Sequence, residues 1–242
     1  MRRKHYNWQL PEEIERRLGE RTYGRQRAML EAGHLLIILH APPEADDTDR
    51  RHMVFLRMPD GRYLCNGQEA GETKLRRLLA SYQEAFAKWD RSYERASSAE
   101  DLFDILEAAA PLNRSSTNLY SALQAARDYV PDDPFLIAMR DEGYEMSRNF
   151  ELLLSDAKLA LDYRIARNAE EQSVKAREMA KAQHKLNILA AVTFPLMAIA
   201  AIFGMGLTHG LEHHSPALFW LVVGACVAIG LITMGWVITG RD

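Results

Sequence analysis

The pattern of hydrophobic and polar positions changes twice along the chain. Residues 1–133 alternate short apolar runs with polar turns, residues 134–187 carry a helical stripe that fades into a polar surface, and residues 188–239 are almost wholly apolar. This pattern predicts an α+β membrane protein: a small cytosolic α/β domain, then a very long stalk helix that continues into the first of two transmembrane helices.

The first stretch predicts helices around a small sheet. A helix is expected over residues 11–33, because Pro11 and the acidic residues after it suit a helix N-terminus. The segments HLLIILH, HMVFLRM and RYLCNG are apolar, rich in β-formers and separated by turn residues, so they predict about three strands. Further helices are expected over residues 74–96, over residues 99–110 with Pro111 ending the helix, and over residues 116–130.

A single stalk helix is expected after the turn PDDP. Asp133 suits the N-cap and Pro134 the first helical position, and no further proline occurs until Pro195. One helix from about Pro134 to Leu207 would span on the order of 110 Å at 1.5 Å per residue. Its surface is almost wholly polar over residues 166–185, and a polar helix of that length needs partners. The chain offers one such helix, so the sequence predicts self-association.

The two apolar runs predict membrane spans over residues 188–207 and 217–238, each long enough to cross a hydrocarbon core about 30 Å thick. Basic residues crowd the entrance to the first span and Arg241 follows the second, whereas the outer loop, residues 208–216, has no Lys or Arg. The positive-inside rule then places both termini, including the tail of residues 239–242, in the cytoplasm. We expect a multi-pass protein of the cytoplasmic membrane.

Charge and composition limit the classes of function that the sequence allows. The chain has a net charge of -3, yet from Leu186 to Thr239 Glu212 is the sole charged residue, which is the segregation that a lipid bilayer demands. The two cysteines have no plausible pairing, so no disulfide framework is expected. Nucleotide-binding, zinc-binding and nucleophile motifs are absent from the sequence, so we expect no enzyme, no cofactor, no nucleic-acid partner and no ATP-driven pump.

The first apolar run resembles the CorA family of divalent metal ion transporters. First spans of that family typically read F-x-P-L-T-x-I-A-G-I-Y-G-M-N, and the matching residues here are Phe194, Pro195, Leu196, Ile199, Ala200, Ile202, Phe203, Gly204 and Met205. The spacing from the proline to the Gly-Met pair is the same. The resemblance covers the stalk and both spans, and the short front domain makes the chain similar to a truncated, CmaX-like relative with GMG in place of GMN.

The resemblance implies a homopentamer whose first spans line a central pore for Mg²⁺, Co²⁺, Ni²⁺ or Zn²⁺. Two departures bear on that function: Gly206 replaces the asparagine that offers amide oxygens at the outer mouth, and Met197 replaces a threonine. A passive divalent cation channel is therefore one hypothesis. A membrane-anchored oligomeric scaffold or sensor, which kept the pentamer and lost selective conduction, is the other.

The candidate residues fall into three sets, each with a plainer alternative. The first set is expected to line the pore and its mouth: Gly204, Met205, Gly206, Ala201, Met197, Phe194, Ala190, Asn187 and Gln183. The alternative is that these residues form a helix C-cap and pack between helices. The outer loop either attracts cations or forms a polar turn, through His209, Glu212, His213 and His214. A regulatory metal site or a solvated loop is expected at Asp46, Asp47 and Asp49.

Overall fold

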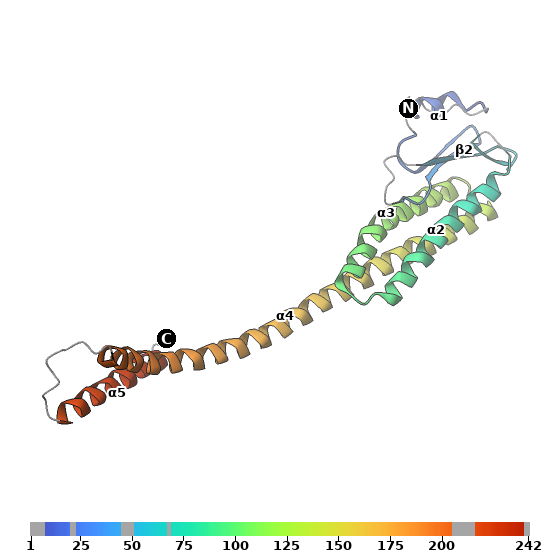
Figure 1. Cartoon of the computed structure of the whole chain (residues 1–242). Helices are drawn as coiled ribbons and strands as arrows, with labels where there is room; N and C mark the ends of the chain where they lie inside the picture. Colours follow the sequence, from blue (N-terminus) through green and yellow to red (C-terminus); the bar gives the residue numbers. More distant parts are fainter. Residues whose placement is uncertain (1–7, 20–22, 45–50, 67–68, 205–215, 240–242) are drawn as a thin grey trace. The chain divides into compact units, whose positions relative to one another are not determined.

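The computed structural model describes residues 8–19, 23–44, 51–66, 69–204 and 216–239 (Figure 1). The chain divides into two compact units, Met1–Ala166 and Arg167–Asp242. Together they contain a small α/β domain and a long helix, α4, which runs from Pro134 to Gly204. Each unit is described in turn.

The first unit contains a four-stranded antiparallel sheet with the strand order β1-β2-β3-β4. The strands are β1 (Arg27–Glu31), β2 (His34–His40), β3 (His52–Arg57) and β4 (Tyr63–Cys65). The three predicted strand segments are confirmed as β2, β3 and β4. β1 is an additional strand, which pairs with β2 from Arg27 opposite Ile38 to Glu31 opposite His34.

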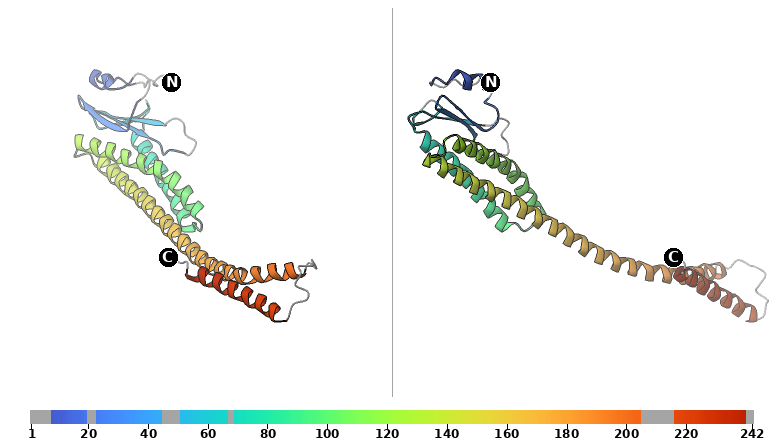
Figure 2. Two further views of the ribbon diagram at one scale, coloured as in Figure 1. Left: turned by 90° about the vertical axis from the view of Figure 1, so that its left-hand side faces the viewer. Right: turned by 180° about the vertical axis from the view of Figure 1, so that it is seen from behind.

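Both faces of the sheet are buried. One face, which includes Ile37 and Phe55, packs against the helices α2 (Gly71–Arg95) and α3 (Ala99–Tyr129) and the start of α4. The other face, which includes Ile38 and Leu56, packs against Ile14 of the short helix α1 (Glu12–Arg16) and the residues beside it. Figures 1 and 2 show α1 on one side of the sheet and α2 and α3 on the other. Burial on both sides explains why residues 35–39 of β2 are all apolar rather than alternating with polar residues.

The helices form a second core away from the sheet. Leu102 and Ile105 of α3 pack there against Leu153 and Leu161 of α4, with Trp89 of α2 beside them. Gly143 allows α4 to approach α3 closely, since a Cβ atom at that position would lie 3.1 Å from a methyl carbon of Leu123. The first part of α4 thus packs against α3.

The predicted helix over residues 11–33 is wrong. Only Glu12–Arg16 is helical, and Arg27–Glu31 is strand β1. Ala32 and Gly33 have φ values of 46° and 74°, so they form the two-residue turn that joins β1 to β2. Ala, Met, Leu and Glu favour helices, but pairing with the buried β2 strand outweighs that intrinsic preference.

The predicted helix end at Pro111 is also wrong. α3 continues through Pro111 as one 31-residue helix. Proline removes one backbone hydrogen bond, yet the buried residues Leu102, Ile105 and Ala109 before it and Leu112 and Leu119 after it keep a single apolar face. Packing of that face on both sides of the proline holds the helix together. Ser98 is the N-cap of α3, and its side chain accepts a hydrogen bond from the Asp101 N–H at 3.0 Å.

The second unit contains the rest of α4 and helix α5 (Pro216–Thr239). The two helices pack together where Gly230, a buried residue of α5, approaches the backbone oxygen of Val192, 3.9 Å from the position that a Cβ atom would occupy. Over the described residues, no helix combines the length and the apolar character that crossing a membrane requires. The spans predicted over residues 188–207 and 217–238 stay predictions.

Candidate functional site on helix α4

One face of α4 in the second unit is open. Gln183, Asn187, Phe194, Met197 and Ala201 are exposed, and Ala190 between them is half-buried. Their spacing of three and four residues places them on one stripe of the helix. The large apolar side chains on this stripe are 68% exposed at Phe194 and 65% at Met197. We call these six residues the α4 stripe.

α5 covers a different face of α4. Val192 is the point of approach to Gly230, and Ile188 and Pro195 are half-buried on the same side. At 100° per residue, the centre of this covered face lies roughly 150° around the helix from the α4 stripe. Among the residues that the structure describes, α5 therefore leaves most of the α4 stripe uncovered.

The chemistry of the α4 stripe changes along its length. Gln183 and Asn187 carry amide groups that can hydrogen-bond to water or to a hydrated ion. From Ala190 to Ala201 the described stripe residues offer methyl groups, a phenyl ring and one thioether sulfur, that of Met197. Thioether sulfur is a soft ligand and suits Mg²⁺ poorly. The stripe is thus polar at one end and apolar over the rest.

Several candidate residues lie outside the described part of the chain. These are Met205 and Gly206 at the expected mouth, the expected cation-attracting residues His209, Glu212, His213 and His214, and the expected regulatory carboxylates Asp46, Asp47 and Asp49. Gly204 is described and forms the last residue of α4. Among the described residues, no group of three or more His, Cys, Asp or Glu side chains could hold a metal ion.

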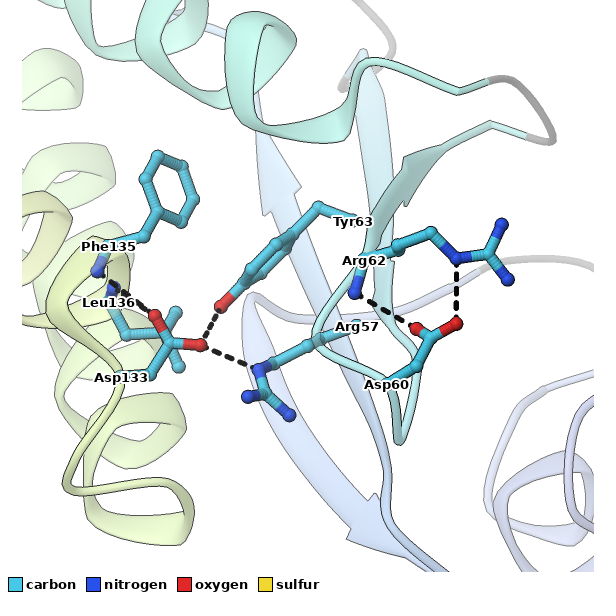
Figure 3. A network of polar contacts seen from close by, with 7 residues as sticks. All are labelled: Arg57, Asp60, Arg62, Tyr63, Asp133, Phe135 and Leu136. Carbon is cyan, nitrogen blue, oxygen red and sulfur yellow. Dashed lines mark hydrogen bonds and ion pairs between the residues drawn. The ribbon is translucent and has the colours of Figure 1, made fainter.

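A polar network at the start of α4 was not predicted in full. Asp133 was expected as the N-cap, and its Oδ1 does accept from the Phe135 N–H at 3.0 Å and the Leu136 N–H at 3.2 Å. Its Oδ2 also accepts from Arg57 Nε at 2.6 Å and from the Tyr63 hydroxyl at 2.9 Å (Figure 3). Arg57 is the last residue of β3 and Tyr63 the first of β4, so one carboxylate joins the sheet to the first turn of α4. The sequence signal that could have revealed this network is a charged N-cap residue, since a carboxylate that is buried requires a counter-ion.

The network explains the ionisation of its members. Burial opposes the charged form of Asp133, but hydrogen bonds from Arg57, the Leu136 N–H and Tyr63 outweigh it and hold the pKa of the carboxyl below its ordinary value. Burial and the charge of Asp133 raise the pKa of Tyr63, so the phenol stays protonated and donates. The side chains of Asp133 and Arg57 are only 8% and 18% exposed. The ion pair therefore has a structural role: it links the start of α4 to the sheet.

One comparison with a solved structure bears on the architecture of the chain. No protein-family model and no curated protein matches the sequence. The structure is similar to that of a full-length CmaX protein, with a TM-score of 0.52, 15% sequence identity, and coverage of 95% of this chain and 82% of that chain. A complete structure of the CorA magnesium transporter from Methanocaldococcus jannaschii gives a TM-score of 0.39 at 17% identity, over 90% of this chain and 79% of that chain. The likeness to CmaX establishes the fold, a small α/β domain with a long helix.

Proposed function

We propose that the chain is one subunit of a homopentameric, passive divalent cation channel of the CorA type in the cytoplasmic membrane. The observation that carries the proposal is the open α4 stripe, which faces away from α5. Its residues Phe194, Met197 and Ala201 lie within the Phe-Pro-Leu…Gly-Met segment. Five copies around an axis would bring these stripes together as the wall of a pore. The spans over residues 188–207 and 217–238 would cross the bilayer, with both termini in the cytoplasm.

The surface of α5 supports a membrane setting. Trp220, Leu221 and Ile232 are each about 70% exposed, and they belong to a helix with no charged residue. Large apolar surface of this kind marks contact with lipid or with another protein. A channel in such a setting needs no chemical energy, because a divalent cation gains about 4.6 kcal/mol per 100 mV of membrane potential on entry.

The apolar part of the stripe keeps a second function open. A constriction lined by phenyl, methyl and thioether groups resists wetting, and Gly206 provides no side-chain amide oxygen at the expected mouth. These features favour a membrane-anchored oligomeric scaffold or sensor that keeps the channel architecture without selective conduction. The two functions share the fold and the oligomer, so only ion movement separates them.

Ion flux into liposomes that contain the purified full-length protein tests the proposal. The assay compares uptake of Mg²⁺, Co²⁺, Ni²⁺ and Zn²⁺ with that of empty liposomes. Met197→Trp fills the proposed pore and should abolish uptake of any ion that passes. Leu189→Trp is the matched control, since Leu189 is also apolar and 59% exposed but lies off the α4 stripe. Equal loss of flux in both variants would show that the α4 stripe does not line the ion path.

Absence of flux for all four ions, with the oligomer intact, would favour the scaffold. Gly206→Asn then separates a latent channel from a true scaffold. The substitution restores a ring of amide oxygens of the kind that hydrated Mg²⁺ contacts, so a latent channel should gain Mg²⁺ uptake. A scaffold should show no Mg²⁺ uptake with either Gly or Asn at position 206.

A further inference from the structure

A row of basic side chains runs along α4 in the second unit toward the predicted first span. Arg177, Lys181 and Lys185 follow one another at intervals of four residues, so they lie on one side of the helix, and all three are exposed. We call these three residues the basic row. Its last member, Lys185, precedes by three residues Ile188, where the apolar run begins. The basic row therefore lies where polar sequence gives way to apolar sequence.

The basic row has no acidic partner within the described part of the chain. Earlier on the same helix Arg167 pairs with Glu171 at 3.2 Å, whereas no side chain of the basic row forms an ion pair or a hydrogen bond with another described residue. Glu178 is the last carboxylate before the apolar run, and no acidic residue follows it until Glu212. The last residues of the stalk thus carry positive charge that the described residues do not neutralise.

The basic row lies on the side of α4 that α5 covers further along the helix. Ile188 and Val192 follow Lys185 by three and seven residues, so the row continues into the face that Gly230 approaches. At 100° per residue, the basic row is centred roughly 160° around the helix from the α4 stripe. In the proposed channel the α4 stripes face a central axis, so the basic row faces outward, toward the surrounding bilayer.

The distance of the basic row from the predicted span suits the headgroups of lipids. At 1.5 Å per residue, Lys185 lies about 5 Å, Lys181 about 11 Å and Arg177 about 17 Å from Ile188 along the helix axis. The headgroup layer is about 5–8 Å thick on each side of the hydrocarbon core. Both lysines can extend their long side chains into that layer, and Arg177 lies within a Debye length, about 10 Å, of its surface. Ammonium and guanidinium groups donate strong, charge-assisted hydrogen bonds to phosphate oxygens.

We propose that the basic row binds the phosphate groups of anionic phospholipids in the cytoplasmic leaflet. A soluble polyanion such as a nucleic acid suits the row less well, because the row ends where the apolar run begins, and lipid is the anion that adjoins apolar surface. The inference rests on the membrane setting of the proposed function, and it does not depend on ion conduction.

Competition between two lipids for the purified full-length protein tests the inference. The protein in neutral detergent is mixed with equal amounts of phosphatidylglycerol, which is anionic, and phosphatidylcholine of the same acyl chains, which has no net charge. Native mass spectrometry then counts each bound lipid. The parent protein should prefer phosphatidylglycerol, and the double variant Lys181→Gln/Lys185→Gln should lose that preference at least tenfold, since each basic residue near an anionic surface contributes about a fivefold factor in binding.

The matched control is the double variant Lys158→Gln/Lys175→Gln. It removes the same two charges from exposed lysines of the same helix, but both lysines precede Ile188 by 13 residues or more. The control should keep the preference of the parent protein. Equal loss of preference in both double variants, or in neither, would overturn the inference. Binding of a short single-stranded oligonucleotide in place of phosphatidylglycerol, lost in Lys181→Gln/Lys185→Gln, would assign the row to nucleic acid and would also overturn it.

Alkaline carbonate extraction of membranes from cells that express the protein separates this inference from the proposed function. Release of the parent protein from the membrane would refute the membrane setting and the inference together. A protein that stays in the membrane but shows no preference for phosphatidylglycerol would overturn the inference alone. A protein with the expected lipid preference that passes no ion would support the inference and refute only conduction.

Discussion

Asp133→Asn should strongly destabilise the first unit while preserving the shape of the side chain. The single amide oxygen of asparagine can still accept from the backbone N–H groups that Asp133 Oδ1 caps. Its amide NH₂ then faces Arg57 Nε and the Tyr63 hydroxyl, which are both donors in the native network. The substitution therefore keeps the cap and removes the acceptor for Arg57.

The expected loss is about 3 kcal/mol in the free energy of unfolding. Breaking a buried pair by removing one partner typically costs about 3–5 kcal/mol, and we take the lower end because the Arg57 side chain is 18% exposed and regains part of its hydration. Tyr63→Phe removes one hydrogen bond to a charged acceptor and should cost about 1.5–3 kcal/mol. Asp60→Asn is the control, because the Asp60–Arg62 pair at 2.7 Å has side chains that are 51% and 64% exposed, and its loss should not change stability measurably.

Urea unfolding of the full-length protein in detergent, followed by circular dichroism, measures these differences. The pH dependence provides a second test. The pKa of Asp133 is lower in the folded than in the unfolded state, so its stabilisation is complete above the unfolded pKa of about 3.9 and disappears as pH falls through the folded pKa. The gap between the native protein and Asp133→Asn should thus be constant near neutral pH and close below about pH 4. A difference in unfolding free energy under about 1 kcal/mol at pH 7 would refute the role of Asp133 in linking α4 to the sheet.

Three shorter predictions concern the same unit. Gly71→Ala should lower the thermal midpoint of unfolding, since its Cβ atom would lie 2.6 Å from the carbonyl carbon of Tyr63 and backbone cannot move aside cheaply; an unchanged midpoint would contradict that close contact. Phe150→Ala should cost about 3–5 kcal/mol in urea unfolding, because Phe150 is completely buried and its removal leaves a cavity; a loss below 1 kcal/mol would mean that the core collapses around it. Cys65 is buried, which raises the pKa of its thiol to about 11, so in a Cys226→Ala background it should resist a thiol reagent at pH 8 until the protein unfolds.

The sequence predicted those elements whose pattern is set by burial. β2, β3 and β4 are short apolar segments bounded by turn residues, and α2 has apolar residues at helical spacing, so hydrophobic periodicity was enough to identify them. The start of α4 was equally predictable, because Asp133 and Pro134 are typical of the first residues of a helix. In each case the local signal and the tertiary packing agree.

The errors occurred where packing overrides the local signal. Residues 27–31 are good helix formers, and their pairing with residues 34–38 of β2 makes them a strand. Pro111 normally ends a helix, and only the buried faces on both sides of it keep α3 continuous. Similarly, nothing in the sequence links Arg57 to Asp133, because 76 residues separate them and the contact exists only once β3 lies beside the start of α4.

The composition of the α4 stripe predicts how a conducting state would discriminate among ions. From Ala190 to Ala201 the described stripe offers no oxygen that could replace water around a cation, and removing water from a divalent ion without replacing it costs far more than the membrane potential supplies. Any divalent cation that passes must therefore keep its hydration shell, and the pore must be wide enough for it. Hydrated Mg²⁺, Co²⁺ and Ni²⁺ present similar outer surfaces, so we expect initial uptake rates into liposomes that agree within about threefold, which corresponds to less than 1 kcal/mol of discrimination. A preference of a hundredfold for one of them would require direct ligands on the ion path, and would show that a segment other than the α4 stripe selects the ion.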